Sequence, residues 1–178
     1  MDYVIADNYL CSLALLEMIL KENGRNISQY DLAEIVGITV PEKYSGSVKN
    51  IVYSHDLNNY GVNLTPEKLC QFFAKNGVAV DVIYLDALRI NEIELNVILE
   101  KYIEQGKYVV FAFSYGVLYG KTLLSNLGHV SLLERVISDD IIQIYDPGPD
   151  NSGVKCVRIS DMYDAMRQKG GLYIFTKQ

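Results

Sequence analysis

The stretch GHVSLLERVISDDIIQIYDPG, Gly128 to Gly148, has the pattern of two β-strands joined by a short acidic turn. Val, Ile and Leu dominate both halves, and these residues are typical of strands. His129, one of two histidines in the chain, opens the first strand, and Asp146 closes the second. The stretch therefore predicts an antiparallel hairpin that carries a titratable side chain at each open end.

The residue numbers of His129 and Asp146 decide which face of the sheet they share. Side chains alternate along a strand with a period of two, and the odd sum of these two numbers puts both on one face. A loop centred at 137–138 would set them directly opposite, with Cβ atoms about 5 Å apart. A two-residue turn at 139–140 would stagger them by four residues, and a bulge or a strong twist would then be needed to bring them together.

Around this hairpin the sequence predicts a helical part first and a sheet part second. Capping residues and glycine stops delimit the helices, whereas β-branched and aromatic runs mark the strands. The predicted helices are 11–23, 28–37, 65–77, 91–106 and 160–170, and the predicted strands are 78–85, 107–114, 129–137, 141–146, 154–159 and 171–177. Since strands and helices do not alternate regularly, the class is α+β with a mostly antiparallel sheet.

We expect one domain over residues 1–178, with the helical part at about 1–106 and the sheet part at about 107–178. The segment 38–63 loses its periodicity and is expected to be an extended connection with one short helical turn. Connections of this length are often lids or cleft walls, and an unrecognised short helix explains the segment equally well.

Composition excludes several function classes. The chain has 178 residues, is 49% hydrophobic and carries a net charge of −6, which is enough apolar material for a substantial core. It has no run of Lys or Arg, so we expect neither nucleic acid nor anionic lipid as a partner. No glycine-rich phosphate loop is present, so nucleotide binding is not supported.

The three cysteines predict free thiols in a reducing compartment. Cys11, Cys70 and Cys156 are odd in number and widely spaced, and no CxxC pair suggests zinc or another metal. The N-terminus is acidic and lacks a long apolar run, so neither a signal peptide nor a membrane span is expected. The expected location is the cytoplasm, and the oligomeric state is left open.

Cys11 differs from the other cysteines by its place at the first turn of an apolar helix. A helix N-terminus and an adjacent imidazolium both favour a thiolate, so Cys11, His129 and Asp146 would supply a nucleophile, a base and an orienting group. Packing of Cys11 into a core, with His129 as an ordinary strand residue, explains the same spacing equally well. Cys70 and Cys156 are expected to be core residues, and His55 is expected to lie in a solvated loop.

The order of these features resembles that of papain-like cysteine peptidases, and most closely the bacteriocin-processing peptidases that cleave double-glycine leaders. The matching stretches cover nearly the whole chain: CSLALLEMIL, ISQYDLAEIVGI, LTPEKLCQFFAKNGV, GKYVVFAF and GHVSLLERVISDDIIQIYDPG. The resemblance implies a papain-like fold with Cys11 as nucleophile, His129 as general acid and base, and Asp146 as orienter. It also implies a thioester intermediate and no metal or organic cofactor.

Two positions depart from this family's pattern. Ile5 stands where the family has a glutamine that donates to the oxyanion, and losing one such donor costs about 10²- to 10³-fold in rate. Asn8 has the right amide chemistry and is the candidate substitute. Ser12 follows the cysteine where glycine is usual, which would narrow the approach to the thiol.

The expected function is hydrolysis or transfer of an acyl group at a peptide or amide bond, with a peptide or an acyl-carrying molecule as substrate. An acyltransferase in peptide or natural-product biosynthesis is one alternative. A catalytically degenerate peptide-binding module is the other, and Ile5 is the main argument for it.

Overall fold

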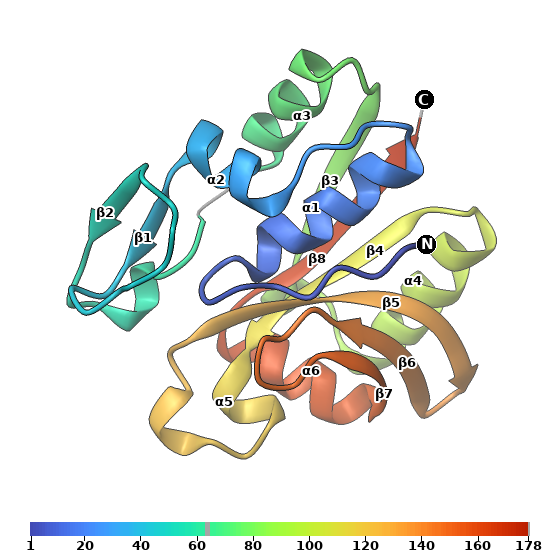
Figure 1. Cartoon of the computed structure of the whole chain (residues 1–178). Coiled ribbons are helices and arrows are strands. Elements are labelled where there is room, and N and C mark those ends of the chain that lie inside the picture. The colour runs from blue at the N-terminus through green and yellow to red at the C-terminus, as the bar shows by residue number, and fades with distance from the viewer. Residues whose placement is uncertain (63–64, 178) are drawn as a thin grey trace. The chain divides into compact units, whose positions relative to one another are not determined.

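The computed structural model describes residues 1–62 and 65–177. Helices and an antiparallel sheet confirm the predicted α+β class (Figure 1). The chain divides into two compact units, a smaller one of Met1–Leu64 with Pro147–Gly153 and a larger one of Thr65–Asp146 with Val154–Gln178. The organisation as one domain stays a prediction.

The smaller unit contains two helices and a small parallel sheet. Its elements are α1 (Cys11–Glu22), α2 (Gln29–Val36), β1 (Ile38–Val40), β2 (Ile51–Tyr53) and the 3₁₀ turn η1 (Leu57–Asn59). Both helices and the single helical turn agree with the sequence. The pairing of β1 with β2 was not predicted, because three residues are too few to show an alternating pattern. Residue 63, at the end of the predicted connection, lies outside the described residues.

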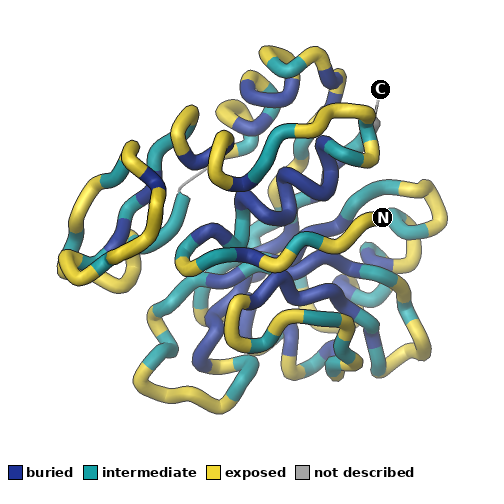
Figure 2. Tube along the Cα trace, in the orientation of Figure 1, coloured by how far each residue is buried: buried dark blue, intermediate teal, exposed yellow. Residues whose placement is uncertain are grey.

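The two helices begin in different ways. Ser28 and Asp31 form the predicted capping box of α2, and Gly37 ends that helix with a φ of 76°. Leu10, at the N-cap of α1, makes no side-chain capping bond. Figure 2 shows α1 as a buried helix and the 41–59 segment as largely exposed.

The larger unit is built on a six-stranded sheet in the order β3-β8-β4-β5-β6-β7. Its strands are β3 (Val80–Asp86), β4 (Tyr108–Ser114), β5 (Gly128–Ser138), β6 (Ile141–Asp146), β7 (Gly153–Arg158) and β8 (Gly171–Lys177). Its helices are α3 (Pro66–Lys75), α4 (Glu92–Glu104), α5 (Tyr115–Leu118) and α6 (Ile159–Gln168), with 3₁₀ turns η2 (Ala87–Arg89) and η3 (Thr122–Leu124). Every predicted strand is present, whereas α5 and the two 3₁₀ turns were not predicted.

Helices pack on both faces of this sheet. Phe111 and Phe113 of β4 are fully buried in one apolar cluster with Leu99 of α4 and Met166 of α6. Burying a side chain of this size contributes about 1.5–3 kcal/mol. On the other face, the ring of Phe175 in β8 contacts Phe73 of α3, with centroids 5.8 Å apart. The strands that carry His129 and Asp146 are therefore part of a well-packed core.

The β5–β6 hairpin follows the second of the two registers that the sequence allowed. Ser138 pairs with Ile141, so the turn lies at 139–140. Two register shifts follow, one between Val136 and Ser138 and one between Leu133 and Arg135. Each shift places an additional residue on β5, as a β-bulge does.

The two bulges halve the offset between His129 and Asp146. Beyond the second bulge, Leu132 pairs with Tyr145. The next step of the ladder sets Asp146 beside Ser131, which is two residues along the strand from His129. His129 and Asp146 thus lie diagonally on one face rather than four residues apart, and the bulge that this register required is present twice.

Candidate active site

The centre of the candidate site in the larger unit is a hydrogen bond between two buried side chains. His129 Nε2 lies 2.8 Å from Asp146 Oδ1. Asp146 is 0% exposed and His129 is 7% exposed. A carboxylate at this position accepts a hydrogen bond from Nε2–H and so fixes both the tautomer and the direction of the imidazole.

Two aromatic rings limit the orientation of the His129 imidazole. Phe113, its partner across β4 and β5, meets it edge to face with centroids 5.5 Å apart. Tyr115 meets it in the same way at 5.2 Å. Because both rings are themselves buried, the imidazole is confined by packing as well as by its bond to Asp146.

Tyr119 completes the surroundings of the carboxylate, and the sequence did not predict its role. Its hydroxyl donates a hydrogen bond to Asp146 Oδ2. Burial, and next the bond to Asp146, raise the pKa of Tyr119 well above its ordinary value, so the phenol keeps its proton. The available signal was the stretch SYGVLYG, in which Tyr115 and Tyr119 lie one helical turn apart between two predicted strands.

Tyr115 and Tyr119 lie in the compact connection between β4 and β5. Ser114 Oγ donates to the carbonyl of Ser125 at 2.6 Å, and the Tyr115 amide donates to Leu127 O at 2.9 Å. Gly116 lies at its centre, where an added Cβ would be 2.3 Å from Lys121 O. Only glycine permits this close approach of backbone to backbone.

Gly116→Ala should therefore disturb the site as well as the fold. We expect a loss of about 1–3 kcal/mol in the free energy of unfolding, because the α5 turn must move to admit the methyl group. The near-ultraviolet circular dichroism of the tyrosines should change with it. The control is Gly24→Ala, where φ is 73° and no atom lies within 4 Å. It should cost about 1 kcal/mol through its backbone alone and leave the tyrosine spectrum intact. Equal spectra for the two variants would contradict the packing role of Gly116.

In the smaller unit, Cys11 is the first residue of α1, as predicted, and is partly buried. Tyr9, two residues earlier, is the one non-glycine residue with positive φ in the described chain, at 68°. Such a conformation is rare for a tyrosine, so the backbone that leads into the cysteine follows an unusual path.

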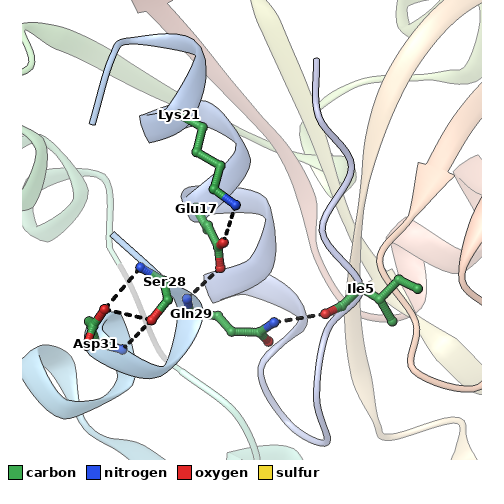
Figure 3. Close-up of polar contacts among 6 residues, drawn as sticks. All are labelled: Ile5, Glu17, Lys21, Ser28, Gln29 and Asp31. Atoms are coloured by element: carbon green, nitrogen blue, oxygen red, sulfur yellow. Dashed lines mark hydrogen bonds and ion pairs between the residues drawn. The ribbon is translucent and has the colours of Figure 1, made fainter. Parts of the chain in front are cut away.

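A buried polar network in the smaller unit holds the segment before Cys11 (Figure 3). Gln29 Nε2 donates to Ile5 O at 2.8 Å, and the Asp7 amide donates to Gln29 Oε1 at 3.0 Å. The Gln29 amide in turn donates to Glu17 Oε2 at 2.6 Å, and Lys21 Nζ lies 2.6 Å from Glu17 Oε1. One glutamine side chain thus holds two backbone groups of the segment that precedes Cys11.

A further backbone bond ties this segment to the residue that follows Asp146. The Ala6 amide donates to Pro147 O at 2.8 Å. The segments that lead into Cys11 and away from Asp146 are therefore neighbours within the smaller unit.

Two of the three positions at issue in the papain-like pattern, Ile5 and Asn8, are exposed, and Ser12 is partly buried. The Ile5 side chain is 64% exposed, and only its backbone takes part in the network. Asn8 is exposed, and its backbone N–H donates to Asp7 Oδ1 at 2.7 Å. Ser12 is partly buried beside Cys11.

Gln29→Ala should loosen the segment before Cys11. It removes two partly buried hydrogen bonds, so we expect a loss of about 1–3 kcal/mol in the free energy of unfolding. Amide hydrogen exchange at Ala6 and Asp7 should become faster than in the unmodified chain. The control, Gln71→Ala on the exposed face of α3, should stay within about 0.5 kcal/mol and change neither amide. Unchanged exchange in Gln29→Ala would show that the segment is held by other contacts.

The remaining candidate residues divide into confirmed and corrected predictions. The His55 side chain is 85% exposed, as expected for a solvated loop, and its Nε2 lies 3.1 Å from Glu42. The prediction that Cys156 is a core residue is wrong, because it lies on the exposed face of the edge strand β7. Cys70 is only partly buried, on the border of the apolar face of α3, so the core prediction was too strong.

Residues 1–62 and 65–177 hold no group of three or more His, Cys, Asp or Glu side chains placed to bind a metal ion together. Within the same ranges, no helix has the length and apolar character needed to cross a membrane.

Comparison with known proteins yields a structural likeness. No protein-family model and no curated protein sequence matches the chain. A solved structure from Bacillus anthracis, described as a "putative C39-like peptidase", is similar with a TM-score of 0.64. The match covers 99% of this chain and 94% of the other at 15% sequence identity. The chain thus shares the fold of this solved structure, in agreement with the predicted α+β class.

Proposed function

We propose that this chain is a papain-like thiol enzyme that hydrolyses or transfers an acyl group at a peptide or amide bond. Cys11 is the nucleophile, His129 the general acid and base, and Asp146 the orienting carboxylate. The observation that carries the proposal is the buried hydrogen bond between His129 and Asp146, in a fold similar to that of a C39-like peptidase.

The proposed chemistry begins with proton transfer from the Cys11 thiol. Since Nε2 of His129 is bonded to Asp146, Nδ1 is the nitrogen that takes this proton. The thiolate then attacks the substrate carbonyl and forms a tetrahedral oxyanion. Collapse of this species expels the leaving amine, which takes the proton from His129, and leaves a thioester on Cys11. Water or another nucleophile, deprotonated by His129, releases the acyl group and restores the thiol.

The oxyanion needs donors that Ile5 does not provide. The first-turn amides of α1 are one source, because Leu10 supplies no side-chain cap to them. The side-chain amide of Asn8 is the second source that we propose. Tyr9, between Asn8 and the helix, has a φ of 68°, which is unusual for a residue other than glycine and turns the backbone sharply at this point.

A peptide-binding module without catalysis is the second candidate. The exposed aliphatic side chain of Ile5 at the position of the usual donor favours it. For either function we propose a peptide or acyl-carrying partner. We also propose a cytoplasmic location, which the three free cysteines support.

The nucleophile assignment predicts a difference in thiol reactivity. With limiting iodoacetamide near pH 6, we expect Cys11 to be alkylated about tenfold faster than Cys70 or Cys156. Cys156 is the more exposed thiol, so access alone would favour the opposite order. Peptide mapping by mass spectrometry measures all three rates in one sample.

The matched variant is His129→Gln, which should slow alkylation of Cys11 and leave Cys156 unchanged. With peptide thioesters as generic acyl donors, the unmodified chain should form an acyl adduct that Cys11→Ala does not form. His129→Gln should turn over at least about 10³-fold more slowly. Equal turnover by Cys11→Ala and the unmodified chain would refute the nucleophile, and absence of any adduct would favour the binding module.

The oxyanion assignment is tested at Asn8. Asn8→Ala should lower kcat by about 10²- to 10³-fold with little effect on KM, because the donor acts on charge that develops in the transition state. Asn59→Ala, an exposed asparagine in η1, is the control and should retain full activity. If kcat of Asn8→Ala stays within threefold of the original value, the backbone amides of α1 act without it.

A further inference from the structure

The Asp146 carboxylate is completely buried, so both of its oxygens need hydrogen-bond donors. His129 Nε2 is hydrogen-bonded to Oδ1 at a distance of 2.8 Å. The Tyr119 hydroxyl donates a hydrogen bond to Oδ2. A carboxylate held at one oxygen can turn about its χ2 angle, whereas a carboxylate held at both has one orientation.

We infer that Tyr119 is a positioning residue for the His129–Asp146 pair, because its hydroxyl holds Oδ2 and thereby keeps Oδ1 directed at His129 Nε2. The inference rests on the proposed function only in assigning the pair a catalytic task. The hydrogen bonds themselves do not depend on that task.

Tyr119 is fixed by the same aromatic rings that confine the imidazole. Its ring lies 4.9 Å from that of Tyr115 and 6.4 Å from that of Phe113. The same two rings meet His129 edge to face. The His129 imidazole and the Tyr119 phenol therefore pack against the same two rings. A displacement of one side chain should affect the other through these close-packed rings.

The charge around Tyr119 favours its role as a donor. The groups that face it are Asp146, Tyr115 and Lys155, whose Nζ lies 5.6 Å from the centre of the Tyr119 ring. That ammonium is buried and makes no hydrogen bond among the described residues. A cation over the face of an aromatic ring is attracted to the ring, so this contact helps to hold Tyr119.

The consequence concerns the tautomer of His129. An ionised Asp146 that accepts from Nε2–H keeps the neutral imidazole unprotonated at Nδ1, the nitrogen that the mechanism uses as base. Without the Tyr119 hydroxyl, Oδ2 loses this donor and the carboxylate is held less firmly toward Nε2. The population with the proton on Nδ1 should then increase.

The test is the nitrogen-15 spectrum of His129 in Tyr119→Phe at a fixed pH above 8. The chain has two histidines, and the exposed His55 serves as internal reference. We expect the original chain to show the Nε2–H tautomer and Tyr119→Phe to show a mixture of tautomers. The control is Tyr163→Phe, which also removes a tyrosine hydrogen bond, to Ile90 O at 2.9 Å, and should leave the His129 signals unchanged. An unaltered tautomer in Tyr119→Phe overturns the inference.

Kinetics give a second reading that separates this inference from the proposed function. With an active chain, kcat of Tyr119→Phe should fall about 10- to 100-fold while KM stays within twofold. An unchanged kcat overturns the inference. A tautomer shift in a chain whose turnover does not depend on Cys11 would refute the proposed function and support the positioning role.

A third measurement needs no variant and applies even if Tyr119→Phe fails to fold. Tyrosine labelled with carbon-13 at Cζ reports each phenol separately. A phenol in water ionises near pH 10. The Tyr119 signal should remain that of a neutral phenol at pH 11, and its ionisation together with the exposed tyrosines would overturn the inference.

Discussion

The burial of one carboxylate constrains most of the larger unit. Asp146 has no contact with solvent, so the fold must bring hydrogen-bond donors to both of its oxygens. His129 reaches it because two bulges shorten the offset across the hairpin. Tyr119 reaches it because the connection between β4 and β5 packs its backbone closely at Gly116. The register of the sheet, the path of the β4–β5 connection and the position of Gly116 thus all contribute donors to the Asp146 carboxylate.

Much of this arrangement follows from the sequence, and the missing parts have physical reasons. The two-residue repeat of a strand predicted a common face for His129 and Asp146. They share it in the structure because each bulge adds one residue to β5, and two such additions restore the parity. The bulges were not predictable, because Glu134 and Ile137 are ordinary strand residues and only the competition between pairings selects them. The role of Tyr119 was not predictable either, since α5 is a single turn that tertiary contacts stabilise.

In the smaller unit, hydrogen bonds to backbone groups hold the segment that precedes Cys11. Ile5 is a departure from the papain-like pattern if only side chains are compared. Its carbonyl, however, is held by Gln29, and the next amide is held by Pro147. The path into α1 is therefore fixed through backbone groups of residues 5 and 6, independently of the Ile5 side chain. This explains how the position can carry an exposed aliphatic side chain while the helix still begins at Cys11.

The bond between Ala6 and Pro147 has a consequence for biosynthesis. The smaller unit consists of the first 64 residues and a short return segment, Pro147–Gly153. A ribosome delivers these two pieces far apart in time, so the early helices emerge while the acceptor for Ala6 is not yet made. The compact form of the smaller unit can be completed only after its return segment, Pro147–Gly153, has been synthesised. The segment before Cys11 therefore cannot make its bond to Pro147 while the first helices emerge.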